Sequence, residues 1–235
     1  MTVLICNYFA QIELDFVDAE KGARADNVGL LLGMFVTIMF SARISGSHFN
    51  PCITFSFMIG NVRSGNFDRI LGFLYIAAQI LGAQLGAIFA TIFASGKEDR
   101  IDLHVTSDDI IQTIIVEIIG AFFLVFMYLS STDKKTKFTD DAAIQTIILA
   151  GSYLGAMLFA GTKLVPLHAS PVNPAISFAI IMWNPSVANW ATFYVFILAS
   201  FIGSFLAIVF FRFIYKGSKD AIDELDEEEE EDERQ

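Results

Sequence analysis

Two Asn-Pro pairs constrain this chain more than any other feature of its sequence. Asn50-Pro51 and Asn173-Pro174 lie 123 positions apart, and an apolar run of about ten residues follows each pair. These runs extend from Cys52 to Gly60 and from Ala175 to Trp183. A helix that crosses a bilayer needs roughly twenty apolar residues, so each run has half the length of a span. Because proline is favoured at the first helical position, each pair predicts the start of a half-helix inside a membrane.

The composition places the chain in a lipid bilayer. Hydrophobic residues make up 54% of it, the mean hydropathy is +0.57, and only 17% of the residues are charged, against about a quarter in soluble domains. The net charge of −11 comes mainly from the segment Asp220–Gln235, whose eleven acidic residues and one arginine contribute −10. The remaining body is close to neutral, so we expect no nucleic-acid partner. Cys6 and Cys52 stand in apolar surroundings, which does not indicate a disulfide framework.

Six apolar segments follow one another along the chain, and five of them have about the length of a span. The first is shorter, and it lacks the basic region and the cleavage site of a signal peptide. We expect it to be the end of a first spanning helix whose start lies upstream of Met1. The segments are Met1–Ala10, Val28–Ile44, Ile70–Ser95, Ile110–Ser131, Ala142–Gly161 and Ala191–Tyr215.

The charges of the connecting segments predict the orientation. Basic residues gather in Arg63–Arg69, in Asp133–Lys137 and in Arg212–Lys219, whereas the segments Asp15–Asp26 and Lys97–Asp109 are mixed or acidic. Positively charged loops stay on the cytoplasmic side. We therefore expect the C-terminal tail in the cytoplasm, where its acidic composition predicts disorder.

An internal repeat relates the two halves. Aligning Asn50 with Asn173 also pairs Ile53 with Ile176 and Phe55 with Phe178. An odd number of spans separates the two motifs, so the halves insert in opposite orientations. The prediction is an all-α integral membrane protein, an inverted repeat with six spans, the first partial, and two re-entrant half-helices. Its parts are a first repeat over 1–109, a second over 110–217 and the acidic tail over 218–235.

These features resemble the aquaporin, or major intrinsic protein, family. Ser45–Pro51 and Asn173–Ala175 are similar to its two loop motifs, and Tyr75–Ala83 and Glu117–Val125 are similar to its third and fourth helices. The resemblance implies a multi-pass homotetramer with a pore in every subunit, which passes water and small neutral solutes without a cofactor or a metal. Two departures stand out, because the family usually has alanine at the position of Cys52 and arginine at that of Ile176.

The paired asparagines predict a barrier to protons. Each amide carries two N–H donors, so a central water that accepts from both Asn50 and Asn173 cannot relay a proton in both directions. The positive ends of the two half-helices add to this barrier. Asn is also a good helix cap, and capping is compatible with lining the pore. We expect Cys52 and Ala175 to line the pore as well. A ladder of backbone carbonyls would accept hydrogen bonds from water at Gly46, Ser47, His48, Ala169, Ser170 and Pro171.

Counting from each asparagine places the selectivity filter that the resemblance implies at Leu30, Gly161, Ser170 and Ile176. None of these residues is charged or aromatic, so we expect a wide and apolar filter. The missing arginine removes a fixed positive charge and its donors. Two consequences remain open: small neutral solutes such as glycerol, urea, ammonia or peroxide are admitted, or the exclusion of cations is relaxed.

Glu117 stands inside an apolar span, where a carboxylate is costly and faces the protein interior. The resemblance implies that it supports a re-entrant loop by accepting hydrogen bonds, and a proton relay is the alternative. Three functions compete: a passive channel for water and small neutral solutes, a channel that leaks cations or protons, and a closed structural or adhesion protein. We do not expect an enzyme, because the sequence contains no evident nucleophile–base set, metal-ligand cluster or phosphate loop.

Overall fold

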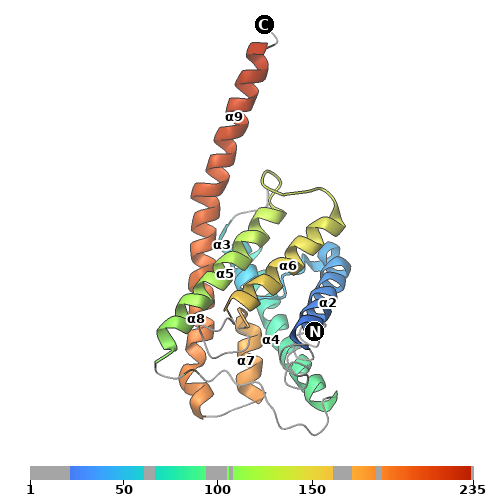
Figure 1. The fold of residues 1–235 in the computed structure, drawn as a ribbon, viewed down its shortest axis with the longest axis vertical. Helices are drawn as coiled ribbons and strands as arrows, with labels where there is room; N and C mark the ends of the chain where they lie inside the picture. The colour runs from blue at the N-terminus through green and yellow to red at the C-terminus, as the bar shows by residue number, and fades with distance from the viewer. Residues whose placement is uncertain are drawn as a thin grey trace.

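The computed structural model describes residues 22–60, 67–93, 105, 108–160, 171–183 and 187–233, and the regular structure within these ranges is helical. The predicted all-α architecture is therefore confirmed, while the predicted first segment, Met1–Ala10, lies outside the described residues. In chain order the elements are α2 (Gly22–Ser45), α3 (Pro51–Gly60), α4 (Arg69–Phe93), α5 (Ile110–Thr132), α6 (Ala142–Ala160), α7 (Pro174–Trp183), α8 (Val187–Phe210), the π-helical turn η1 (Phe211–Tyr215) and α9 (Lys216–Glu233) (Figure 1).

Four of the described helices are long and apolar enough to cross a membrane: α4, α5, α6 and the continuous rod formed by α8, η1 and the start of α9. α2 is 24 residues long and contains the whole of the predicted apolar segment Val28–Ile44. Large apolar side chains point outward from the bundle, with Phe40 78%, Ile70 72% and Phe213 71% exposed, as expected of a surface that contacts lipid.

The two half-helices enter the bundle from opposite ends (Figure 1). α3 and α7 are ten residues long, and each begins at the proline of its Asn-Pro pair, which confirms the predicted starts. α3 contacts α4 and α8, and α7 contacts the same two helices. α3 and α7 also contact each other, and their starts are joined by hydrogen bonds, so both half-helices begin where the two halves of the chain meet. Such an arrangement is expected when two repeats insert in opposite orientations.

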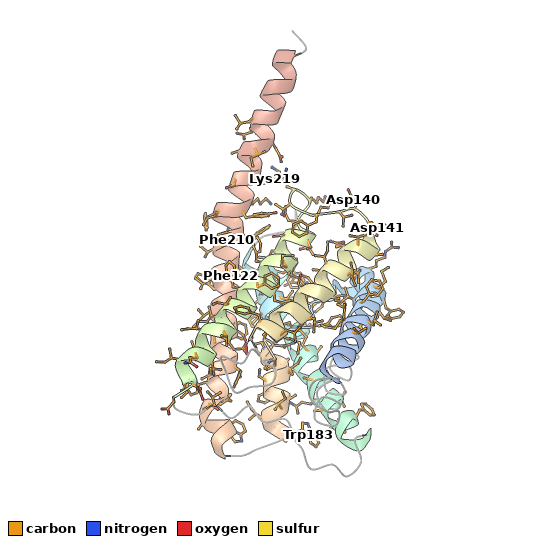
Figure 2. The ribbon with its side chains drawn as sticks, in the orientation of Figure 1. Phe122, Asp140, Asp141, Trp183, Phe210 and Lys219 are labelled. Atoms are coloured by element: carbon orange, nitrogen blue, oxygen red, sulfur yellow. The ribbon has the colours of Figure 1, made fainter. Side chains whose placement is uncertain are left out.

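Small residues let α5 pack closely against its neighbours. A methyl group added to Gly203 of α8 would lie 2.2 Å from the carbonyl oxygen of Ile118 and 3.0 Å from Cβ of Ala121. Close approach of this kind is typical of helix pairs in membranes. At the lipid side of the same contact, the rings of Phe122 and Phe210 lie edge to face with their centroids 5.6 Å apart (Figure 2).

The expectation of disorder in the tail 218–235 is wrong for the residues described, because α9 is helical from Lys216 to Glu233. It continues α8 through η1 and extends away from the bundle (Figure 1). Glutamate is a good helix former, and a helix that grows from an existing one needs no new nucleus. Lys216 Nζ donates to Oδ2 of the buried Asp133 at 2.6 Å, which ties the start of α9 to the segment between α5 and α6.

Candidate functional site

The two asparagines cap the half-helices that they precede. Asn50 Oδ1 accepts a hydrogen bond from the backbone N–H of Cys52 at 2.9 Å, and Asn173 Oδ1 accepts one from Ala175 at 3.0 Å. Both asparagine side chains are fully buried. The capping role considered from the sequence is therefore present in both halves, and it fixes the orientation of each amide group.

The amide nitrogens bind across the boundary between the two halves. Asn50 Nδ2 donates to the carbonyl oxygen of Val172 at 2.8 Å, and Asn173 Nδ2 donates to that of Phe49 at 3.0 Å. Phe49 and Val172 occupy equivalent positions in the repeat, each one residue before its asparagine. The two motifs are thus joined by a reciprocal pair of hydrogen bonds, which we call the cross-ties. They bring together segments that are more than 120 residues apart in the chain.

The backbone before each asparagine adopts an unusual conformation. The φ angle is positive at Gly46 (77°), Ser47 (53°), Phe49 (49°) and Val172 (45°). A positive φ is sterically unfavourable for a β-branched residue such as Val172, and such conformations persist where surrounding contacts hold them. Phe49 and Val172 are the residues whose carbonyls accept the cross-ties. The strained backbone therefore lies where the two halves meet.

A tyrosine from α6 joins the paired asparagines. Asn173 Nδ2 donates a second hydrogen bond to the hydroxyl of Tyr153 at 2.8 Å, and the side chain of Asn50 lies near the same hydroxyl. Tyr153 is 1% exposed. Tyr153 was not predicted as a site residue, although its place in the sequence indicates the role. It stands eight residues, about two helical turns, before Gly161, so it shares a helix face with that predicted filter position.

A cavity of about 550 Å³ lies between α2, α5 and α6 and reaches the segment before α3. The Tyr128 hydroxyl is 2.6 Å from the carbonyl oxygens of both Gly46 and Ser47, two members of the predicted ladder. Because a carbonyl oxygen has two lone pairs, this contact leaves room for a second donor at each. The cavity is lined by Met39, Ala42, Arg43, Gly46, Tyr128, Thr132, Ala142, Gln145, Thr146 and Leu149.

His48 packs in an aromatic environment, as the resemblance implies for a residue of this loop. Its ring stacks on Phe57 with 4.5 Å between centroids, and its Nδ1 lies 3.3 Å from the hydroxyl of Thr54. Gln79 of α4 donates to the same hydroxyl at 2.8 Å. The ring thus supports the start of α3. The ladder role of its carbonyl stays a prediction, as does that of the buried Pro171, while Ala169 and Ser170 lie outside the described residues.

The two residues that follow the Asn-Pro pairs have different surroundings. Cys52 is fully buried, its carbonyl oxygen accepts a hydrogen bond from Ser204 Oγ at 2.9 Å, and its thiol is close enough to Tyr153 for an electrostatic interaction. Ala175 packs with Ala83 and other small residues of α4. Cys52 therefore borders the asparagine pair and Ala175 belongs to a helix contact, and the lining role of each stays a prediction.

The predicted filter is described only in part. Ile176 is 6% exposed and packs in an apolar cluster with Val116 of α5 and Phe196 of α8. Gly161 and Ser170 lie outside the described residues, as does the side chain of Leu30, so the filter stays a prediction. Glu117 is fully buried on α5, close enough to Cys52 for an electrostatic interaction. Among the described residues, no three metal-ligating side chains form a group that could hold an ion.

Comparisons with known proteins agree on one family. Residues 2–211 match the major intrinsic protein family. Aquaporin PIP2-1 of Arabidopsis thaliana is 32% identical over 195 residues, which cover 79% of this chain but only 64% of that protein. Aquaporin TIP1-2 of Musa acuminata is 27% identical over 212 residues, which cover 89% of this chain and 78% of that protein. The fold is similar to that of the aquaglyceroporin from Plasmodium falciparum, with a TM-score of 0.71, 19% identity and 94% of both chains covered.

Proposed function

The chain belongs to the major intrinsic protein family, and from this membership we propose that it is a passive transmembrane channel for water and small neutral solutes. Members of this family are channels rather than enzymes. The aquaporins of Arabidopsis and Musa, to which this chain is similar, support water as the first permeant to test. The observation that carries the proposal is the reciprocal pair of cross-ties between Asn50 and Val172 and between Asn173 and Phe49.

The cross-ties support proton exclusion in the following way. Each amide has two N–H groups, and in each case one is directed to a carbonyl of the opposite half. The second N–H of Asn173 donates to the Tyr153 hydroxyl, and the Asn50 side chain lies near the same hydroxyl. A water in this region would accept from the amides and could not pass a proton onward. The N-terminal ends of α3 and α7 add a positive potential that opposes cations.

The proposed permeants include solutes larger than water. Ile176 is aliphatic and buried where the family usually has arginine, and Gly161 and Ser170 are small. We assign these three residues and Leu30 to a filter that is wider than that of a strict water pore. Glycerol, urea, ammonia and peroxide are the candidate solutes.

Two further features complete the proposal. We place α9 in the cytoplasm, because it is joined through Lys216 and Asp133 to the basic segment between α5 and α6. We also propose a homotetramer, since apolar side chains such as Phe73 and Leu81 of α4 are exposed and can contact lipid or a second copy. Protease access to sealed vesicles of known orientation tests the first statement, and native mass spectrometry in detergent tests the second.

The permeation proposal is tested with purified protein in lipid vesicles. In stopped-flow light scattering, vesicles that contain the protein should shrink faster under an osmotic gradient than empty vesicles, with a low activation energy. A pH-sensitive dye inside the same vesicles should report no added proton leak. Unchanged shrinkage, with protein that is folded by circular dichroism and present at a known density, would overturn the proposed function.

A further inference from the structure

The cavity between α2, α5 and α6 leads toward the paired asparagines along one face of α6. Its lining on this helix consists of Ala142, Gln145, Thr146 and Leu149, which stand at positions i, i+3, i+4 and i+7 of one helix face. The next position on that face is Tyr153, four residues beyond Leu149. The cavity lining therefore ends one helical turn before the tyrosine whose hydroxyl accepts from Asn173.

The contacts of Tyr153 place its hydroxyl where a permeating water would bind. Its oxygen accepts from Asn173 Nδ2 at 2.8 Å, and the Phe49 carbonyl accepts from the same nitrogen at 3.0 Å. Because an amide has two N–H groups, both donors of Asn173 are in use. A water molecule at this position must compete with the phenol for the amide. The ring itself is 1% exposed and packs in the core cluster that contains Cys52 and Val172.

We propose that Tyr153 is a specificity-determining residue of the channel, located at the asparagine pair rather than at the outer filter. This assignment rests on the proposed function. The hydroxyl competes with water for the Asn173 amide, and the ring sets the width of the path beside the cross-ties. The wild-type channel consequently passes glycerol more slowly, relative to water, than its predicted outer filter alone would allow, because that filter contains no bulky residue.

Three variants separate the hydroxyl from the ring. Tyr153→Phe removes the competing oxygen and keeps the ring, whereas Tyr153→Val removes both. Tyr194→Phe is the matched control, because Tyr194 is 43% exposed on α8 and lies outside the pair. Each protein is reconstituted at equal density, its fold is checked by thermal unfolding, and water and glycerol fluxes are measured by stopped-flow light scattering.

Tyr153→Phe should raise water permeability by about fivefold, the rate equivalent of one hydrogen bond of about 1 kcal/mol, with the ratio of glycerol to water flux unchanged or lower. Tyr153→Val should raise that ratio, and Tyr194→Phe should change neither value. A purely structural role for Tyr153 would not move the ratio. If the wild type conducts water and neither Tyr153 variant changes the water flux or the ratio of glycerol to water flux, the assignment of Tyr153 is wrong, while the proposed channel function is retained. If Tyr153→Val does not fold, an unchanged water flux in Tyr153→Phe overturns it. A failure of every folded variant to conduct water would overturn the proposed function instead.

Discussion

Removing the asparagine side chains measures how strongly the two halves are joined. Asn50→Ala deletes the acceptor for the Cys52 N–H and the donor to the Val172 carbonyl, both in fully buried surroundings. A buried group that is left without its partner costs about 1–3 kcal/mol, so the loss of unfolding free energy should be about 2–6 kcal/mol. Asn173→Ala deletes the corresponding two bonds and also the bond to Tyr153. It should therefore be the more destabilising change.

The double variant tests whether the cross-ties act as a unit. Both join the same two segments, so breaking one lets them separate and weakens the other. The combined loss should fall short of the sum of the single losses by about 0.5–3 kcal/mol. Equilibrium unfolding in mixed detergent micelles, followed by circular dichroism, gives the three values. Gln112→Ala, at an exposed position on α5, is the control and should change stability by less than about 0.5 kcal/mol. Losses that simply add would refute the coupling of the two motifs through reciprocal bonds.

Two further predictions concern packing and the C-terminal helix. Gly203→Ala should destabilise the protein by about 1–3 kcal/mol in the same unfolding assay, because the new methyl group meets the Ile118 carbonyl oxygen. Gly151→Ala is the control, and it should be neutral or stabilising because the space around Gly151 is open. Equal effects of the two substitutions on stability would contradict the close crossing of α5 and α8. Lys216→Met should speed proteolysis of the segment between α5 and α6, because the buried Asp133 loses its cationic partner. A cleavage rate equal to that of the wild type would show that this ion pair does not hold the segment between α5 and α6 in place.

Local signals explain what the sequence predicted well. The start of each half-helix follows from a proline and from the length of the apolar run, which are properties of about ten neighbouring residues. The capping bonds of Asn50 and Asn173 span two residues and follow from the same local chemistry. Equivalence in the repeat then predicts that the two motifs meet, as the cross-ties show.

Some site residues depend on long-range contacts, which the sequence does not predict. The Tyr128 hydroxyl reaches the carbonyls of Gly46 and Ser47 across more than 80 residues, and no local pattern indicates this pairing. Tyr153 is similar, because its role depends on a contact between α6 and Asn173, twenty residues further along the chain. The helical tail was missed for a different reason. Composition alone predicts disorder, whereas α9 is an extension of the membrane helix α8.

The inverted repeat gives Tyr153 a counterpart that clarifies its meaning. Tyr153 precedes Asn173 by twenty residues, and Leu30 precedes Asn50 by the same number. In an inverted repeat, equivalent positions lie on opposite sides of the midplane. Counting places Leu30 in the predicted outer filter, so Tyr153 takes the equivalent place on the side of the cavity and of α9. Leucine has no hydrogen-bonding group and tyrosine has one, so the two halves differ in chemistry although their backbones are related. Selection by the channel would then depend on the half that contains the tyrosine: the water flux of Tyr153→Phe measures the effect of the hydroxyl, and the ratio of glycerol to water flux in Tyr153→Val measures the effect of the ring.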